Sequence, residues 1–172
     1  MRAHEPANRT SGTGSATRLG IAVLALLGLG DALYMLAYHE GMSSSLICPF
    51  FGGSCDVVGR SKHARHFGVP NAAVGALVYA AMIALALWPD DKPPKRRAWQ
   101  PFGLAFVSLA AGAASIFLTW EQAARVRAWC FWCLLSVGVN MMILPMAMSE
   151  AWRAARLLPH RPARRAADVP PA

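Results

Sequence analysis

Charged residues are scarce in this chain, and acidic ones are the scarcest. They make up 15% of the sequence, with 9 Asp and Glu against 17 Lys and Arg, whereas about a quarter of a soluble domain is charged. A hydrophobic share of 55% excludes a disordered chain, and the shortage of charge argues against a soluble domain. The net charge of +8 would suggest nucleic-acid binding in a soluble protein. Here the basic residues gather between long apolar runs, which indicates a membrane protein with basic flanks and no nucleic-acid partner.

Four apolar runs divide the chain, at residues 19–38, 71–88, 102–120 and 130–149. Twenty helical residues at about 1.5 Å each cross a hydrocarbon core of about 30 Å. The sequence therefore predicts an all-α, integral membrane four-helix bundle. A long loop, residues 39–69, joins the first two helices, and the other connections are short. The first run is longer than the apolar region of a cleaved signal peptide, so we interpret it as a retained span.

Basic residues also predict how the bundle is oriented. The two tails and the connection between the second and third runs hold 12 Lys and Arg, and the opposite side holds 5. The positive-inside rule places the richer side in the cytoplasm, together with both termini. We expect residues 1–17 to form a disordered cytoplasmic tail, residues 18–152 the transmembrane domain, and residues 153–172 a basic, disordered cytoplasmic tail.

All four cysteines fall on the non-cytoplasmic side of this topology. Cys48 and Cys55 lie in the long loop, and Cys130 and Cys133 form a C-x-x-C at the start of the fourth run. Disulfides form and persist on that side of a membrane. At a helix N-terminus the free backbone amides and the helix dipole favour the thiolate of the first cysteine, and the spacing allows a disulfide between the two. Two pairs that can reach each other suggest a two-step thiol relay.

Two other interpretations of the cysteines remain open. The chain could be a non-enzymatic membrane scaffold with two structural disulfides, which typically have reduction potentials below about −300 mV. It could also be a zinc-binding membrane protein, although Cys48 and Cys55 enclose six residues and zinc-binding pairs usually enclose two to four. A c-type haem site would need His after Cys133, where the sequence has Leu134.

Several further motifs accompany the cysteines in a fixed order. They are Asp31-x2-Tyr34, Cys48-x6-Cys55, Ser61, Phe67-Gly68-Val69-Pro70-Asn71-x3-Gly75-x3-Tyr79 and Cys130-x2-Cys133. Together they resemble the vitamin K epoxide reductase family, and the bacterial quinone-reducing branch in particular. The resemblance covers about residues 20–148 and implies the same four-helix membrane domain.

The resemblance also implies roles for single residues. Cys130 and Cys133 would form the redox centre beside a quinone, with Cys133 facing the quinone ring. Cys48 and Cys55 would be a shuttle pair that takes electrons from a thioredoxin-fold partner. Asn71 would donate a hydrogen bond to a quinone carbonyl. Such a donor stabilises the charge that develops on the oxygen as the quinone is reduced. Ser61 would help to position the shuttle cysteines.

The expected function is therefore that of a membrane thiol oxidoreductase. It would reoxidise a periplasmic or lumenal DsbA-like protein, pass the electrons to a quinone of the ubiquinone, menaquinone or vitamin K type, and so support disulfide bond formation. We expect a bacterial inner-membrane location. Vertebrate members have Tyr four residues after the second cysteine of the C-x-x-C, where this chain has Val137, so epoxide reduction is not expected. The resemblance covers no fused thioredoxin domain, so the expected partner is a separate protein.

A few polar residues near the apolar runs remain without a firm assignment. Asp31 lies inside the first run, where an ionisable side chain indicates either a functional site or a packing hydrogen bond. His39, His63 and His66 lie in or beside the first loop and are expected at the surface, where His63 and Arg65 could contact a partner.

Overall fold

A computed structural model describes residues 10–88 and 99–157 of the chain. The helices and strands in these residues, in chain order, are α1 (Thr10–His39), α2 (Ser54–Arg60), the 3-10 turn η1 (Lys62–Ala64), β1 (Arg65–His66), β2 (Val69–Pro70), α3 (Asn71–Ala86), α5 (Trp99–Glu121), the π-helical turn η2 (Gln122–Val126) and α6 (Phe131–Leu157). The described residues are thus mostly helical, as the long apolar runs predict.

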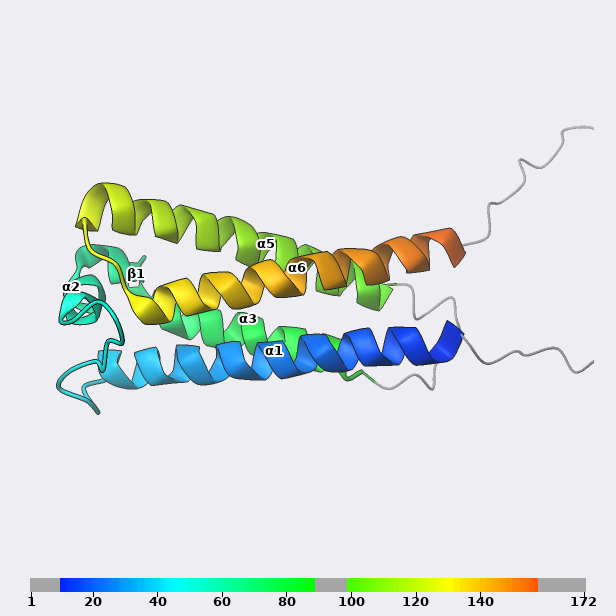
Figure 1. The fold of residues 1–172 in the computed structure, drawn as a ribbon, viewed down its shortest axis with the longest axis horizontal. Coiled ribbons are helices and arrows are strands. Elements are labelled where there is room, and N and C mark those ends of the chain that lie inside the picture. Colours follow the sequence, from blue (N-terminus) through cyan, green and yellow to red (C-terminus); the bar gives the residue numbers. More distant parts are fainter. Residues whose placement is uncertain (1–9, 89–98, 158–172) are drawn as a thin grey trace, which may run out of the picture.

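The longer helices lie side by side along one axis (Figure 1). α1 packs against α3 and α6, and α5 packs against α6 and α3, so each of these helices contacts two others. α1 begins and α6 ends at the same end of the bundle. The short elements α2 and β1 lie at the opposite end, next to the end of α1 and the beginning of α6. Both cysteine pairs are therefore found at one end of the molecule.

Small side chains form much of the core between the helices. Ala22, Ala25, Ala76, Ala111 and Ala147 are buried there beside larger residues such as Met82 and Ile143. Small residues let helix backbones approach closely, which matters in a membrane because lipid removes most of the hydrophobic driving force between helices. A polar contact adds to the packing, since the Asn140 amide nitrogen on α6 donates a 2.8 Å hydrogen bond to Ser115 Oγ on α5.

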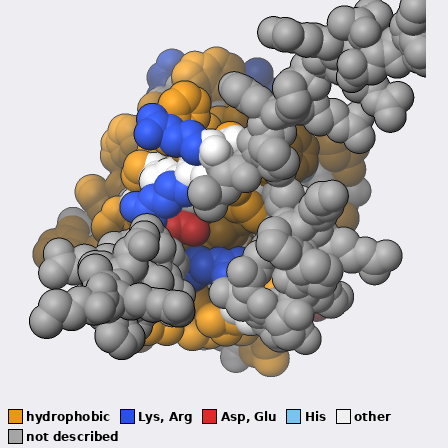
Figure 2. All heavy atoms as spheres, turned by 90° about the vertical axis from the view of Figure 1, so that its right-hand side faces the viewer, with side chains coloured by type: hydrophobic (Ala, Val, Ile, Leu, Met, Phe, Trp, Pro, Cys, Tyr) orange, Lys and Arg blue, Asp and Glu red, His pale blue; other side chains and the backbone are white. Residues whose placement is uncertain are grey.

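Three of the helices are long and apolar enough to cross a membrane, at Gly14–His39, Trp99–Val126 and Phe131–Arg156. Large apolar side chains on their outer faces are exposed, among them Leu26, Phe106 and Ile116. In a chain that crosses a membrane, such side chains face lipid. Figure 2 views the end where α1 begins and α6 ends, and Lys and Arg side chains gather there among apolar ones.

The number and lengths of the helices differ from the sequence prediction. The described residues contain five α-helices instead of four, because α2 forms inside the loop that was expected to be irregular. α3 has 16 residues, which at about 1.5 Å each make about 24 Å, and it is shorter than a typical span. The apolar run continues to Trp88, but the helix ends at Ala86.

The predicted tails need correction at both ends of the bundle. α1 begins at Thr10, so residues 10–17 are helical and not part of a disordered tail. α6 likewise continues to Leu157, past the predicted boundary at residue 152. The rest of the two predicted tails, residues 1–9 and 158–172, lies outside the described residues, as do residues 89–98 of the short second connection.

The contact between α1 and α3 depends on a glycine. A Cβ atom built at Gly28 would overlap the ring of Tyr79, which is buried, whereas a Cβ at Gly30 would meet nothing within 4 Å. We therefore expect Gly28→Ala to lower the free energy of unfolding by about 1–3 kcal/mol, the usual cost of overpacking. Gly30→Ala should leave it unchanged or raise it by up to about 1 kcal/mol through helix propensity. Thermal unfolding of the two variants in detergent measures the difference, and equal melting temperatures would contradict the packing argument.

Candidate functional site

The long loop is attached to the bundle at Ile47, next to Cys48. Trp132 Nε1, on α6, donates a 2.7 Å hydrogen bond to the Ile47 carbonyl oxygen. The Ile47 amide in turn donates to the hydroxyl of Tyr34, on α1, at 3.1 Å. The rings of Tyr34 and Trp132 are also in contact, with centroids 4.8 Å apart. One loop residue is thus held by both helices, and this fixes Cys48 over the start of α6.

A second attachment holds the segment around α2. Arg60, at the end of α2, donates from Nε to the Tyr38 hydroxyl at 2.8 Å and from Nη2 to the Ser44 carbonyl at 3.1 Å. At the other end of the same helix, Asp56 Oδ1 accepts a 3.2 Å hydrogen bond from the Leu46 amide. The loop is therefore folded onto the bundle, and α2 carries Cys55 to the centre of the contact.

The two cysteine pairs belong to one buried cluster. Cys48 and Cys55 form a disulfide, whereas Cys130 and Cys133 are free thiols. Cys55 and Cys130 are both 0% exposed in this cluster, and Cys48 and Cys133 are partly buried and pack against it. The fold thus brings together four cysteines that lie in two segments far apart in the sequence.

Cys130 is held in place immediately before α6. Its amide donates a 3.0 Å hydrogen bond to Gln122 Oε1, which is buried. Between these residues Arg127 adopts a left-handed backbone (φ 55°), which turns the chain from η2 toward α6. The hydrogen bond from Cys133 lowers the pKa of the Cys130 thiol; the Cys133 and Trp132 amides also lower it, and burial opposes them. The arrangement therefore favours a thiolate at Cys130.

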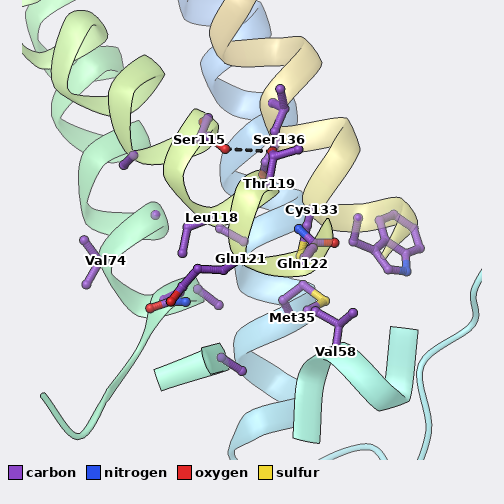
Figure 3. A pocket seen from close by; sticks show the side chains of 18 of the residues that line it. Met35, Val58, Val74, Ser115, Leu118, Thr119, Glu121, Gln122, Cys133 and Ser136 are labelled. Atoms are coloured by element: carbon purple, nitrogen blue, oxygen red, sulfur yellow. Dashed lines mark hydrogen bonds between the residues drawn. The ribbon is translucent and has the colours of Figure 1, made fainter. Parts of the chain in front are cut away.

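A cavity of about 360 Å³ opens beside Cys133, between α1, α3, α5 and α6 (Figure 3). Its volume is within the range of small-molecule sites, about 300–1,000 Å³. Most of the side chains around it are apolar, such as Met35, Val74 and Leu118, and Trp132 also lines it. Cys133 contributes to the lining and Cys130 does not. The two thiols of the C-x-x-C therefore face different surroundings.

Asn71 also lines the cavity, at the first residue of α3. Its amide nitrogen donates to the His63 carbonyl at 2.8 Å, and its amide oxygen is 2.8 Å from His66 Nδ1. The hairpin β1–β2 brings His66 next to Asn71. Phe67 and Gly68 both have positive φ, 52° and 81°, and they turn the chain back between the two strands. Such a two-residue turn favours glycine, which accounts for Gly68 in the motif.

Glu121, the last residue of α5, is buried near Asn71. His63 Nδ1 lies 3.0 Å from Glu121 Oε1, and His66 Nε2 lies 3.2 Å from Glu121 Oε2. The Glu121 side chain is 5% exposed. A carboxyl group, two imidazoles and an amide thus meet at one side of the cavity.

The sequence of the chain matches a known protein family. The sequence model of the vitamin K epoxide reductase family matches residues 19–148, about three quarters of the chain. The chain belongs to the vitamin K epoxide reductase family. A relative from Arabidopsis thaliana, described as "Thiol-disulfide oxidoreductase LTO1", is 26% identical over 124 residues. The match covers 70% of this chain and 33% of the relative, so the chain spans about a third of the length of that protein.

In this member of the vitamin K epoxide reductase family, the predicted site residues lie at one end of the bundle. Cys133, Asn71 and Ser61 line the cavity, and Cys48, Cys55 and Cys130 lie in the adjoining buried cluster. Ser61 Oγ donates to the Val58 carbonyl at 2.8 Å, so it contacts the α2 helix that carries Cys55. Val137 lines the cavity too and offers no hydrogen-bond donor there.

The structure answers part of the question about Asp31. Ser136 Oγ on α6 donates a hydrogen bond to Asp31 Oδ2 on α1, which is a packing contact between two helices. Asp31 also lines the cavity, and its Oδ1 atom is buried with no hydrogen-bond partner among the described residues. Both interpretations of Asp31 therefore find support.

Other residues of the site differ from the prediction or were missed. His63 is not a surface residue, because its side chain is 17% exposed and contacts Glu121. Glu121 and Gln122 end an apolar run, where polar residues are ordinary, and no sequence signal pointed to their burial. No sequence signal pointed to the hydrogen bond between Trp132 and the Ile47 carbonyl either. In residues 10–88 and 99–157, no three His, Cys, Asp or Glu side chains are arranged to hold a metal ion.

Trp132 tests the attachment of the loop. We expect Trp132→Phe to remove the hydrogen bond to Ile47 while keeping a ring in place, at a cost of about 0.5–1.5 kcal/mol. Opening of the loop should then be about 2- to 12-fold more frequent. Hydrogen exchange of the amides in residues 44–48 measures this opening. Trp152→Phe, a change at the exposed other end of α6, is the matched control and should leave the exchange unchanged.

Proposed function

We propose that this chain is a quinone-dependent thiol–disulfide oxidoreductase of the membrane. One observation carries the proposal: Cys130 is buried in a cluster with the Cys48–Cys55 disulfide, while Cys133 packs against this cluster and also lines the adjoining apolar cavity, which Asn71 lines too. A C-x-x-C between a second cysteine pair and a cavity is arranged to pass electrons from one to the other. Membership of the family and the thiol–disulfide oxidoreductase among its relatives support the same conclusion.

Burial suggests the order in which the cysteines react. Cys48 is partly exposed and Cys55 is not. A thiolate of a thioredoxin-fold partner attacks Cys48, and Cys55 leaves as a thiolate. The second thiol of the partner then breaks the mixed disulfide and releases Cys48. The partner leaves oxidised, and the loop pair has gained its two electrons.

The second exchange takes place inside the buried cluster. The Cys55 thiolate attacks Cys130 of an oxidised Cys130–Cys133 pair, and Cys133 leaves as a thiolate on the side of the cavity. Cys48 then attacks Cys55, the loop disulfide forms again, and Cys130 is released. In the structure Cys48 and Cys55 form the disulfide, and Cys130 and Cys133 are free thiols.

The cavity has the properties that a quinone ring requires. It is lined mostly by apolar side chains, it lies between helices of which three are long and apolar enough to cross a membrane, and Asn71 brings an amide to its wall. When bound, a quinone accepts two electrons and two protons. Asn71 would donate a hydrogen bond to one carbonyl oxygen, and the Cys133 sulfur would face the ring. The apolar walls would keep water away from the thiolate.

The proposal includes the topology expected from the sequence. α3 would cross the membrane as a fourth, short span. The basic residues Arg18, Arg153 and Arg156 lie at one end of the bundle, and the two cysteine pairs lie at the other. By the positive-inside rule both termini would then lie in the cytoplasm. The chain would belong to the bacterial quinone-reducing branch of the family, and its cysteines would face a periplasmic DsbA-like partner. Disulfide formation in exported proteins would be the outcome.

The two-stage relay is tested by cysteine variants of the purified chain. Cys130→Ser and Cys133→Ser should each abolish quinone reduction by any thiol. Cys48→Ser and Cys55→Ser should abolish reduction driven by a thioredoxin-fold protein and spare reduction driven by a small membrane-permeant dithiol, which bypasses the loop. Quinone absorbance gives the rate. Identical behaviour of all four variants with the small dithiol would show that there is no relay, as expected of a scaffold with structural disulfides.

Asn71 tests the quinone site. A hydrogen bond to developing charge contributes about 1.5–3 kcal/mol, so Asn71→Ala should slow quinone reduction by about 10- to 150-fold. Exchange between the partner and the Cys48–Cys55 pair should hardly change, because it involves no quinone. The two half-reactions are measured separately by stopped flow. Normal quinone turnover, or equal loss in both halves, would show that Asn71 only begins the helix.

A further inference from the structure

Glu121 is a buried carboxyl group for which the electron relay has no role. It lies at the end of α5, and in Figure 3 its side chain extends away from Cys133, whereas that of Gln122 points toward Cys133. Its partners come from the folded loop: His63 on η1 reaches Oε1 at 3.0 Å, and His66 on β1 lies 3.2 Å from Oε2. Three segments of the chain thus place ionisable groups at one wall of the cavity.

The hydrogen bonds of Asn71 determine where His66 carries a proton. The His63 carbonyl can only accept, so the amide nitrogen of Asn71 must face it, and the amide oxygen must face His66. An amide oxygen also only accepts, and therefore His66 Nδ1 bears a hydrogen. This leaves His66 Nε2, on the side of Glu121, as the ring atom that can gain or lose a proton.

Glu121 Oε2 is the atom of this cluster that is free to act on a ligand. It is buried, and it has no hydrogen-bond partner among the described residues, because the contact with His66 has ion-pair distance but not hydrogen-bond geometry. Glu121 lines the cavity, together with Asn71, His63 and His66. The side chain is more than nine-tenths buried, and an unpaired oxygen in such a place is costly unless it holds a proton or meets a ligand.

The other ionisable groups that face the cavity are few. They are Asp31 and His39 on α1, Tyr79 on α3 and Cys133 on α6, and no Lys or Arg is among the lining residues. His63 and His66 are therefore the groups that can balance a charge on Glu121 within this wall. The side chain of His66 is 37% exposed, so the cluster also has a connection to water.

We propose that Glu121, with His63 and His66, forms a proton-donating cluster for the quinone oxygen that Asn71 binds. This inference rests on the proposed function. As the Cys130–Cys133 disulfide forms, the two thiols give up two electrons and two protons, and the quinone gains two of each. Glu121 Oε2 hands one proton to the oxygen at Asn71, and His66 takes up a replacement from water and passes it to Glu121 through Nε2. One thiol supplies the second proton of the quinone, and the proton of the other thiol is released to water, so no other oxidant or reductant is needed.

The decisive variant is Glu121→Gln, which keeps the shape of the side chain and removes its transferable proton. We expect reduction of menadione by the pre-reduced full-length chain to slow by about 100-fold or more at neutral pH, the usual contribution of a general acid. The remaining rate should rise tenfold for each unit by which the pH falls, because water must now supply the proton. The wild-type rate should change much less over the same range.

Two further variants separate proton transfer from structure. Glu121→Asp keeps a carboxyl group and should recover part of the rate and the flat pH profile. His66→Gln, a change at a partly exposed position, should also slow menadione reduction and steepen its pH dependence. Glu40→Gln, an exposed acid at the end of α1, is the matched control and should behave as wild type.

A binding measurement gives a readout besides activity. Trp132 lines the cavity, so binding of oxidised menadione should quench the intrinsic tryptophan fluorescence. Glu121→Gln should bind menadione within about threefold of the wild-type affinity, since its amide can still donate a hydrogen bond. If Glu121→Gln fails to fold, it loses this binding. In that case the pH profile of His66→Gln decides whether the cluster donates a proton.

The outcomes separate this inference from the proposed function. If wild type does not reduce menadione, the proposed function fails. If wild type reduces it and both Glu121→Gln and His66→Gln keep the wild-type rate and pH profile, the proton-donating cluster is wrong while the electron relay stands. Equal slowing of menadione reduction and of thiol exchange at Cys48–Cys55 would also overturn the inference, because it indicates a structural role.

Discussion

Attachment of the loop at Ile47 is the contact on which the site depends. Its backbone is bound on one side by Trp132 of α6 and on the other by Tyr34 of α1. Without this contact Cys48 and Cys55 would belong to a loop of about thirty residues, whose closure entropy opposes any fixed position. With it, the disulfide lies in the cluster that contains Cys130. Burial also shields Cys55 and Cys130, both 0% exposed, from water.

The site has two chemically different halves that meet at the C-x-x-C. The half toward the loop is the buried cluster around the cysteines, and two of its members, Met35 and Val58, also line the cavity. The half toward the bundle is a cavity that is lined mostly by apolar side chains, with polar side chains among them. Cys130 belongs to the first half and Cys133 to the second. In the proposed relay, a single turn of helix would therefore separate thiol exchange with a protein from electron transfer to a small molecule.

Much of the architecture could be predicted because it depends on local patterns. Apolar runs and the charge asymmetry indicated membrane helices, and cysteine spacing with the family motif indicated Cys48, Cys55, Cys130, Cys133 and Asn71 as one site. The rest depends on tertiary contacts. Trp132 bonds to a residue 85 positions away, and Glu121 meets His63 at a distance of 58 residues in the sequence. Polar residues at the end of an apolar run have the same sequence pattern whether they face water or a cavity. α2 could not be foreseen because it is short and is stabilised by its contacts with Leu46 and Tyr38.

The π-helical turn after α5 gives the site a mechanical property. Turns of this kind interrupt the regular hydrogen bonding of a helix and are frequent at functional sites. Here Glu121 and Gln122 are consecutive residues at the point where the helix changes, and one contacts His63 while the other holds the amide of Cys130. One peptide bond joins them. A shift of the backbone at Glu121 would therefore be felt at Gln122 and at the hydrogen bond that supports Cys130, which links the wall of the cavity to the position of the thiol.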